Sequence, residues 1–566
     1  MTTWWRRSPD ISGREIALAA LGAALLFLAL FWPLPLHLGR DIPLDTGDPL
    51  SQAWQVAWDG HALTAQPLHI FQANQFWPLR NTLAFSDALL GYAPAGLFGS
   101  GPHAAVARYD LLFLLAGALA LLGAFLLARE LGAPPWAAAI GGAAFACAPW
   151  RLEQGGHLHV LSSGGIPLAL FLLLRGYRRE HTGLILAGWA VCAWQFSLGF
   201  TLGLQLGYLL VVLALLSAVS WWRAGRPRPA RRLVVATVVG GGLFALLAIA
   251  LARPYLQVLH DHPEARRTAA LVARYSGPPR MFLAASHTDL VWGAATAGVR
   301  DSLPVVPEET LFPGLATLLL AIAGLGWRGF PRSLRIGLGV ATLVLAILSL
   351  GFQVHGAGRF LPYRLLYEVV PGWKGIRVPG RLHTLTSLAL ALLAAGGAAR
   401  ALATTEERRG RRAAGLLAGV LLAVVILEGA GFGIDRGGAA VAGYPHPRAP
   451  RIPAGLAGLR APLLQLPVRP DDNRRYLLWS TAGFPRMLNG RSSFEPRTFV
   501  RTTRAVEGFP DAASVALLRA QGVHTVVIHA DQAPGSAWAA WAARPSGGLG
   551  LRRERRGPLV IYHLDG

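Results

Sequence analysis

Carboxylate side chains gather in one stretch of this sequence, shortly after its first apolar run. Asp45 and Asp48 stand three residues apart, and Asp87 follows further along the same stretch. Carboxylates close to a bilayer are costly unless they are paired or used, so these three are candidate catalytic groups. A carboxylate that is partly removed from water has a raised pKa, which suits it to accept a proton from a hydroxyl group. For Asp48, which precedes Pro49, capping of a helix is the structural alternative.

Basic side chains form a second set of candidate functional residues, because an anionic group such as phosphate needs cations to bind it. Arg377 and Arg381 stand four residues apart before another apolar run, and a guanidinium binds phosphate through two parallel hydrogen bonds. The segment APWRLEQGGHLHV adds three further candidates, Arg151, His157 and His159. Contact with lipid headgroups or with water is the structural alternative for this set.

The same carboxylates offer the hard oxygen ligands that Mg²⁺ or Mn²⁺ prefers. The spacing between Asp45 and Asp48 is not diagnostic of a metal site, so a divalent cation is an option and no cofactor is firmly predicted. The sequence contains no His-Glu-x-x-His helix, Cys-x-x-Cys pair, Gly-x-Ser-x-Gly elbow or P-loop.

Membrane-crossing helices must position these residues. The chain has 566 residues, of which 53% are hydrophobic and only 15% are charged, against about 25% charged in a typical soluble protein. Apolar runs of roughly 17 to 24 residues recur along it, which is the length that spans a bilayer. The sequence predicts a polytopic α-helical protein with about eleven transmembrane helices, over residues 15–38, 109–131, 135–150, 158–175, 183–199, 200–222, 233–253, 310–327, 336–352, 382–402 and 412–432.

Arginines decide the predicted orientation, because cytoplasmic loops carry an excess of positive charge. Short connections with arginines alternate with long segments, which cover 39–108, 254–309, 353–381 and 433–566. The N-terminal segment, with Arg6, Arg7 and Arg14, belongs to the arginine-bearing set. We therefore predict a multi-pass membrane protein with a cytoplasmic N-terminus and an extracytoplasmic C-terminal segment.

The predicted division of the chain is a transmembrane domain, 1–432, followed by an extracytoplasmic domain, 433–566. Within the first domain, the outer loop 39–108 is predicted to carry interfacial helices. Trp54 and Trp58 lie one helical turn apart there, and indole rings favour the membrane interface.

The C-terminal segment differs in kind from the rest. Residues 461–467 and 558–563 are typical of strands, whereas 510–529 indicates a helix, a stop at Gly522 and then a buried strand. These patterns predict a small α/β domain outside the membrane.

Charge and topology restrict the function classes. The formal net charge of +23 comes almost entirely from arginine, and the arginines form short clusters between apolar runs, which argues against a nucleic-acid partner. The two cysteines, Cys147 and Cys192, lie in apolar segments, so no disulfide framework is expected. A reaction on the outer side has no supply of nucleotide sugars, and this favours a substrate that is carried by a lipid phosphate.

Several runs of the sequence together resemble the GT-C superfamily of integral-membrane glycosyltransferases: GDPLSQAWQVAWDGHAL, FQANQFWPLRNTLAFSDALLG, EETLFPGL, RVPGRLHTL, NGRSSFEP and FPDAASVALLRAQGV. The resemblance covers most of the chain and is to bacterial members, which implies a location in the bacterial inner (cytoplasmic) membrane. It implies a GT-C-like fold, a polyprenyl-phosphate sugar as donor and an acidic general base in the first outer loop, which falls on Asp48. An Asp-Glu pair of the protein-mannosyltransferase kind is not evident, so the acceptor, whether glycan, lipid or protein, stays open.

The resulting hypothesis is an inverting glycosyltransferase of the cell envelope, with membrane lipids around it. Two alternatives remain. A transporter or flippase of a lipid-linked saccharide needs charged or broken helices at mid-membrane, ideally in repeats, whereas the ionisable residues here lie mostly at helix edges. A non-catalytic membrane assembly protein of GT-C architecture is not distinguished by sequence.

Overall fold

The computed structural model describes residues 8–223, 230–353, 362–434, 440–532, 537–543 and 547–564, so Arg6 and Arg7 lie outside the described residues. The chain forms two compact units. Unit 1 comprises Met1–Leu36, Leu111–Ile249 and Arg267–His446. Unit 2 comprises His37–Asp110, Ala250–Arg266 and Pro447–Gly566.

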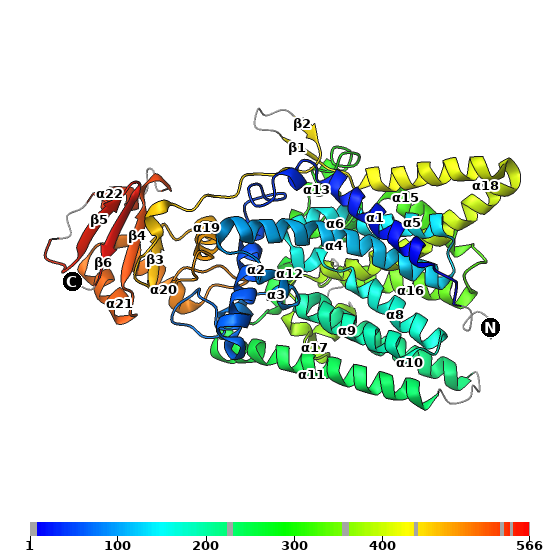
Figure 1. Cartoon of the computed structure of the whole chain (residues 1–566), viewed down its shortest axis with the longest axis horizontal. Helices are drawn as coiled ribbons and strands as arrows, with labels where there is room; N and C mark the ends of the chain where they lie inside the picture. The colour runs from blue at the N-terminus through cyan, green and yellow to red at the C-terminus, as the bar shows by residue number, and fades with distance from the viewer. Residues whose placement is uncertain are drawn as a thin grey trace. The chain divides into compact units, whose positions relative to one another are not determined.

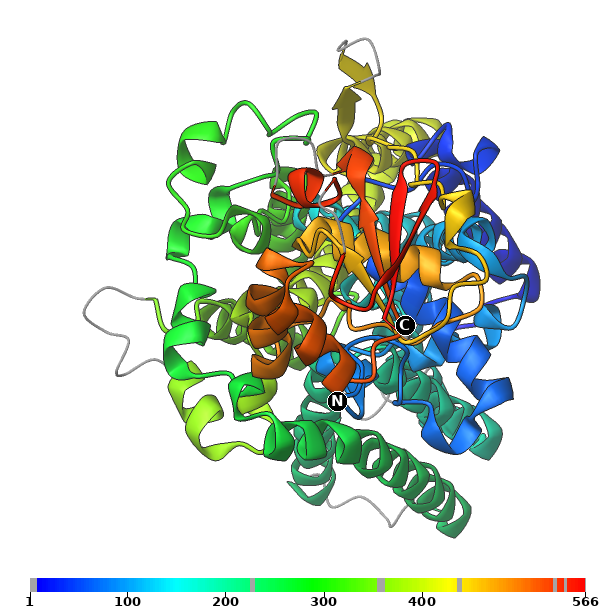
Figure 2. The ribbon, with the colours of Figure 1, turned by 90° about the vertical axis from the view of Figure 1, so that its left-hand side faces the viewer.

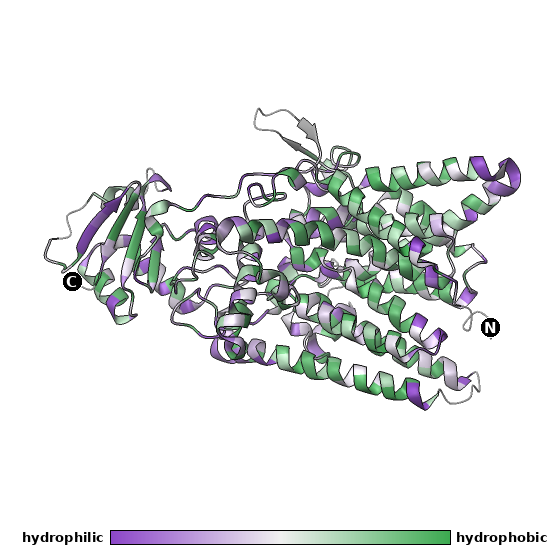
Figure 3. Cartoon of the chain, viewed as in Figure 1, coloured by the Kyte–Doolittle hydropathy of each residue, from purple (hydrophilic) through white to green (hydrophobic). Residues whose placement is uncertain are grey.

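Apolar helices are the most prominent elements of the chain (Figures 1 and 3). Among the described residues, seven stretches are long and apolar enough to cross a membrane: α1 (Gly13–Leu30), α4 (Gly101–Leu131), α7 with α8 (Leu158–Arg178), α10 (Phe200–Arg223), α11 (Arg231–Asp261), α16 (Arg332–Ser349) and the turn η9 with α18 (Pro379–Glu428). Shorter apolar helices accompany them: α5 (Pro135–Ala146), α9 (Thr182–Leu198) and α15 (Leu315–Leu325).

The last of the long stretches is two helices in one. At Gly410 the backbone turns to φ 83° and ψ 171°, which ends one arm of α18 and begins the next. The arms correspond to the predicted helices 382–402 and 412–432, and every other predicted range also falls on an apolar helix. The chain is therefore a multi-pass membrane protein, as predicted.

Short elements fill the connections between the long helices. They are α3 (Ala93–Gly96), α6 (Pro149–Glu153), α12 (Ala269–Arg274), α13 (Ala297–Arg300), α14 (Val306–Glu309) and α17 (Pro362–Val369). After α18 follow the antiparallel pair β1 (Phe432–Ile434) and β2 (Ala440–Ala442) and, further along, the short helix α22 (Ala537–Trp541).

Small residues allow the helices of unit 1 to approach closely. Gly324 of α15 and Gly397 of α18 lie where the two helices touch. A methyl group at Gly324 would collide with the carbonyl group of Leu393, and one at Gly397 with that of Leu320. Membrane helices have little hydrophobic drive to associate in lipid, so close packing of this kind stabilises their contact.

Unit 2 joins the first loop segment to the C-terminal segment. Helix α2 (Asp48–Ala65) packs against α19 (Pro470–Ser480). Trp54 and Trp58 are only 1% and 4% exposed, in a core that they share with Leu477 and other side chains. The interfacial position predicted for the two indole rings is therefore wrong, because protein and not lipid covers this face of the helix.

A second core in unit 2 draws on three separate parts of the chain. Phe76 and Phe85 come from the first loop segment, Val258 from the end of α11, and Phe494 and Phe499 from the C-terminal segment. The compact units thus follow a different division from the boundary at 432/433. An independent domain over 433–566 stays a prediction.

A four-stranded sheet lies in the C-terminal segment, with β4, β5 and β6 in red in Figure 2. Its order is β3 (Leu463–Leu466), β4 (Thr525–His529), β6 (Leu559–His563) and β5 (Arg552–Arg556). Strands β3 and β4 are parallel, and the other neighbours are antiparallel. The predicted strands at 461–467 and 558–563 and the α/β character of this segment are confirmed.

Parallel strands need a long crossover, and here it contains α19, α20 (Arg497–Ala505) and α21 (Ala512–Ala520). Helix α21 begins with a capping box in which Asp511 and Ser514 exchange hydrogen bonds. It ends before Gly522, whose φ of 72° suits glycine. The helix, the stop and the strand predicted over 510–529 are all present.

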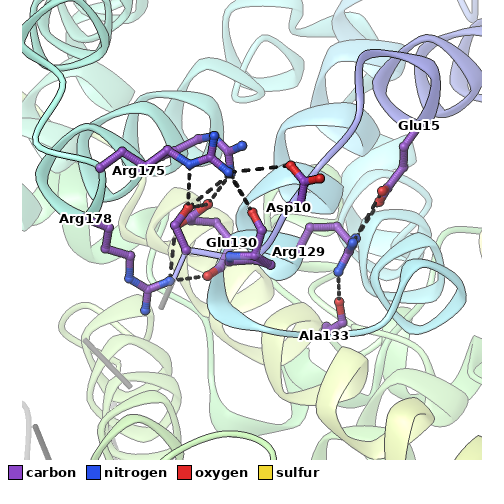
Figure 4. A network of polar contacts seen from close by, with 10 residues as sticks. Asp10, Glu15, Arg129, Glu130, Ala133, Arg175 and Arg178 are labelled. Atoms are coloured by element: carbon purple, nitrogen blue, oxygen red, sulfur yellow. Dashed lines mark hydrogen bonds and ion pairs between the residues drawn. The ribbon is translucent and has the colours of Figure 1, made fainter. Parts of the chain in front are cut away.

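One buried carboxylate is central to an ionic network at the ends of α4 and α8 in unit 1 (Figure 4). Glu130 is fully buried, and its carboxylate lies 2.7 Å from Arg175 Nη1 and 3.2 Å from Arg178 Nη1. The neighbouring Arg129 pairs with Glu15 of α1 at 2.5 Å. The network thus connects three helices through charged groups that are largely shielded from water.

We predict that Glu130→Gln destabilises the protein by about 3 to 5 kcal/mol, because the variant leaves buried arginines without a counter-charge. The measurement is thermal unfolding of the purified protein in detergent. The matched control is Glu406→Gln, which breaks an exposed pair with Arg411 and should cost less than about 1 kcal/mol. Equal unfolding midpoints for the two variants would show that the network does not stabilise the fold.

Candidate functional site

The predicted phosphate-binding residues of unit 1 come from two separate connections. Arg381 lies in the single turn η9 (Pro379–Leu382), which leads directly into α18. His157 and His159 lie between α6 and α8. A third connection adds Glu308 in α14, which sequence analysis did not place among the site residues.

Arg381 joins the three connections. Its Nη2 donates to Glu308 Oε1 at 3.0 Å, and its Nη1 lies 3.0 Å from His159 Nε2. Because a guanidinium only donates, His159 Nε2 accepts here, and the neutral ring then carries its proton on Nδ1. The side chains of Arg381 and Glu308 are only 10% and 7% exposed, so this is a largely buried ion pair.

Two further predicted residues lie around the same carboxylate. The His157 ring centre is 5.6 Å from that of His159, and the Arg377 guanidinium lies over the Tyr275 ring at 4.8 Å from its centre. Both His157 and Arg377 act electrostatically on Glu308. The structure therefore brings Arg377, Arg381, His157 and His159 together around Glu308, and their role in binding phosphate stays a prediction.

The pKa values of Glu308 and its neighbour Glu309 are shifted in opposite directions, although both side chains are buried. Burial alone raises the pKa of a carboxyl, but at Glu308 the charges of Arg381, His157 and Arg377 outweigh it and lower the pKa to about 2. At Glu309, which is 1% exposed, burial dominates and raises the pKa to about 7. The first carboxyl is thus ionised at neutral pH, while the second exchanges its proton near neutral pH.

Arg151 has a different environment from the other predicted cations. Its side chain is fully buried, donates to the Leu161 carbonyl and to Ser163 Oγ, and lies 5.4 Å from the Phe145 ring centre. These contacts anchor the connection between α6 and α8. Its phosphate-binding role stays a prediction, and no exposed part of the side chain supports it.

The predicted catalytic carboxylates belong to unit 2. Asp48 is the first residue of α2, and Gly47 is the N-cap, so the alternative in which Asp48 caps the helix is wrong. Its Oδ1 accepts from Arg474 Nη2 at 2.8 Å and from Arg474 Nε at 3.2 Å. The Asp48 side chain remains 41% exposed, which leaves it accessible to a substrate.

The contacts of Asp45 and Asp87 give less support for a catalytic role than those of Asp48. Asp45 Oδ1 accepts from the Gly47 N–H at 2.6 Å, which closes the turn before α2. Asp45 and Asp48 both act electrostatically on the buried Tyr109 of α4. Asp87 lies later in the first loop segment, where its main-chain carbonyl accepts from the Gln55 side chain at 2.9 Å. Catalytic roles for Asp45 and Asp87 stay predictions.

Two polar residues of unit 2 were not among the residues predicted from the sequence. Arg474 stands beside Arg475 in α19, and nothing in the sequence distinguishes the two. Asp59 of α2 is fully buried, and within the described chain neither of its carboxylate oxygens has a hydrogen-bond partner. Burial raises the pKa of Asp59 well above its ordinary value, which favours the neutral acid and makes it unsuited as a base.

The divalent cation that the sequence left as an option finds no ready ligand set in the part of the chain that the structure describes. No three His, Cys, Asp or Glu side chains there are grouped to hold a metal ion. Asp48 is engaged by Arg474, and Asp45 by the Gly47 amide. A metal therefore stays a prediction.

Comparisons with known proteins give a fold and no sequence family. No family model matches the chain, and no curated protein matches it significantly. Among solved structures, the arabinofuranosyltransferase AftD from Mycobacteria matches with a TM-score of 0.58 and 17% identity, covering 99% of this chain and 40% of that one. This chain thus spans about two fifths of the AftD chain.

Two other solved structures are more distant. The oligosaccharyltransferase of Archaeoglobus fulgidus matches with a TM-score of 0.45 and 14% identity, covering 97% of this chain and 73% of that one. ArnT from Cupriavidus metallidurans matches with a TM-score of 0.38 and 15% identity, covering 97% of each chain. The assignment of the GT-C fold therefore rests on AftD.

We predict that Glu309 makes stability depend on pH. Its pKa is about 7 in the folded state against an ordinary 4.5, so the folded state holds a proton that the unfolded state has lost between these values. Its contribution to stability is therefore present below pH 4.5 and is lost as pH rises to about 7. Glu309→Gln should remove this slope from the thermal midpoint, whereas the exposed control Glu507→Gln should keep it. An unchanged slope in Glu309→Gln would contradict the assignment.

Proposed function

We propose that this chain, which has the GT-C fold, is a glycosyltransferase that uses a polyprenyl-phosphate sugar as its donor. The observation that carries the proposal is the likeness to AftD over 99% of this chain. That protein is named an arabinofuranosyltransferase, so its chemistry is transfer of a sugar. The resemblance of the acidic first loop and of the RVPGRLHTL run to the same superfamily supports the proposal independently.

The cationic cluster of unit 1 is the proposed site for the donor phosphate. Arg377 and Arg381 would bind its oxygens, because guanidinium groups match the geometry of phosphate and stay charged at all relevant pH values. Glu308 offsets only part of the positive charge around it. His157 and His159 would add hydrogen bonds to the phosphate.

The proposed reaction is a single displacement at the anomeric carbon of the sugar. An acceptor hydroxyl oxygen forms the new glycosidic bond from the face opposite the phosphate, so the configuration inverts. The bond between the anomeric carbon and the phosphate oxygen breaks, and the polyprenyl phosphate leaves with the electron pair. Asp48 takes the proton of the acceptor hydroxyl as general base. Phosphate is a good leaving group, so no strong general acid is needed.

The lipid-linked donor follows from the predicted orientation. If the first loop segment and the C-terminal segment face the outside, nucleotide sugars do not reach them. A sugar already activated on a lipid carrier does reach them, and a multi-pass protein meets such a carrier within its own membrane. The acceptor would be a glycan, lipid or protein at that outer face.

We predict that Asp48→Asn abolishes sugar transfer, by about 100-fold or more, because an amide cannot accept the proton. The purified variant should remain folded and inserted, as shown by its thermal midpoint. The measurement is release of label from polyprenyl-phosphate sugars carrying a radioactive sugar. The matched control is Asp531→Asn, at an exposed position, which should transfer like the wild type. Full activity in Asp48→Asn would exclude it as the base.

We predict that the C-terminal segment is labelled from outside the cell. The two natural cysteines are buried, so single added cysteines report on their own positions. A membrane-impermeant maleimide should modify Ala457→Cys in intact cells, but Glu407→Cys, in the connection between the arms of α18, only after permeabilisation. The reverse pattern would remove the argument for a lipid-linked donor.

A further inference from the structure

A single guanidinium from the C-terminal segment holds the proposed base. Arg474 Nη2 and Nε both donate to Asp48 Oδ1, at 2.8 Å and 3.2 Å. Its Nη1 donates to Asp471 Oδ1 at 2.6 Å. The Arg474 side chain is only 13% exposed, whereas Asp48 and Asp471 are 41% and 77% exposed. The cation is thus shielded from solvent, while the carboxylate that it holds stays open to a substrate.

The two helices that carry this pair are fixed to one another. Trp54 of α2 and Leu477 of α19 belong to one buried core. Asn74, which accepts from the Trp54 indole at 3.0 Å, itself donates to the Pro485 carbonyl at 2.9 Å. The backbone of Arg474 is therefore held relative to that of Asp48, and the guanidinium is anchored on its far side by Asp471.

We propose that Arg474 is a positioning residue for Asp48, which orients the carboxylate and keeps it ionised for its role as base. This inference rests on the proposed function. The guanidinium fork restricts the rotation of the Asp48 side chain, and Asp48 already lies in the first turn of a helix. A positive charge at this distance favours the ionised carboxylate, which is the form that accepts a proton.

The carboxylates near Asp48 favour its protonation, so the positive charge of Arg474 is important for keeping it ionised. Asp45 lies in the preceding turn, and Asp471 lies beyond Arg474 on α19. Tyr109 of α4 is the neutral titratable group that Asp48 acts on. Apart from Arg474, the groups named here are acidic or neutral, and nearby negative charge favours protonation of a carboxylate. Arg474 opposes that effect.

The test compares two substitutions of Arg474 with a matched substitution of its neighbour. Arg474→Gln should lower kcat by about 10- to 100-fold, as expected for a base that is free to rotate, and leave the donor KM close to that of wild type. The acid limb of the pH profile of kcat should move up by about one unit, because the carboxylate protonates more readily. Arg474→Lys, which keeps a charge without the fork, should shift the limb less than Arg474→Gln.

The control is Arg475→Gln on the same helix, whose guanidinium pairs with Asp472 at 3.5 Å. It should keep the wild-type kcat and pH profile. A purely structural role for Arg474 predicts a lower thermal midpoint with an unmoved acid limb in Arg474→Gln, and this result would overturn the proposal. So would a wild-type profile in a folded Arg474→Gln. If Asp48→Asn transfers sugar normally, the proposed base fails instead, whatever Arg474 does.

Discussion

Hydrocarbon tolerates neither an unsatisfied backbone polar group nor an isolated charge, and much of this molecule follows from that constraint. Helices satisfy their backbone hydrogen bonds internally, so the apolar runs become helices and ionisable side chains collect at their ends. Two of the buried carboxylates each lie beside opposite charges. Glu130 lies between Arg175 and Arg178, and Glu308 lies against Arg381. The ionisable side chains that could act in catalysis or binding therefore lie in the connections between the membrane-spanning helices and not within the helices themselves.

Within the cationic cluster, environment and not residue type decides charge. Glu308 and Glu309 are consecutive glutamates, yet cations lower the pKa of one while burial raises the pKa of the other. Opposite shifts in neighbouring carboxyls are common where a site needs one fixed charge and one exchangeable proton. In the proposed function, the fixed charge of Glu308 orients Arg381 before phosphate arrives.

The helices and the C-terminal strands could be predicted because their signals are local. Length and hydropathy identify a membrane-spanning helix, and a capped helix followed by Gly522 and an apolar run identifies α21 and β4. The burial of Trp54 and Trp58 could not be predicted, since helical spacing shows that a face is apolar but not whether lipid or protein covers it. Arg377, Arg381, His157 and His159 could be selected as candidates from residue type, but nothing local singled out Arg474.

Arg474 could not be predicted because unit 2 is built from segments that lie far apart in the sequence. The bond between Asp48 and Arg474 joins residues 426 positions apart. The main-chain N–H of Phe76 donates to the Asn489 carbonyl, and that of Met487 to the Asn74 carbonyl, so backbone hydrogen bonds join the two segments as well. The C-terminal segment is therefore part of the framework that sets the position of α2, and with it the position of Asp48. A separate appended domain could be lost without disturbing the first loop, whereas this segment shares its core and its hydrogen bonds with that loop.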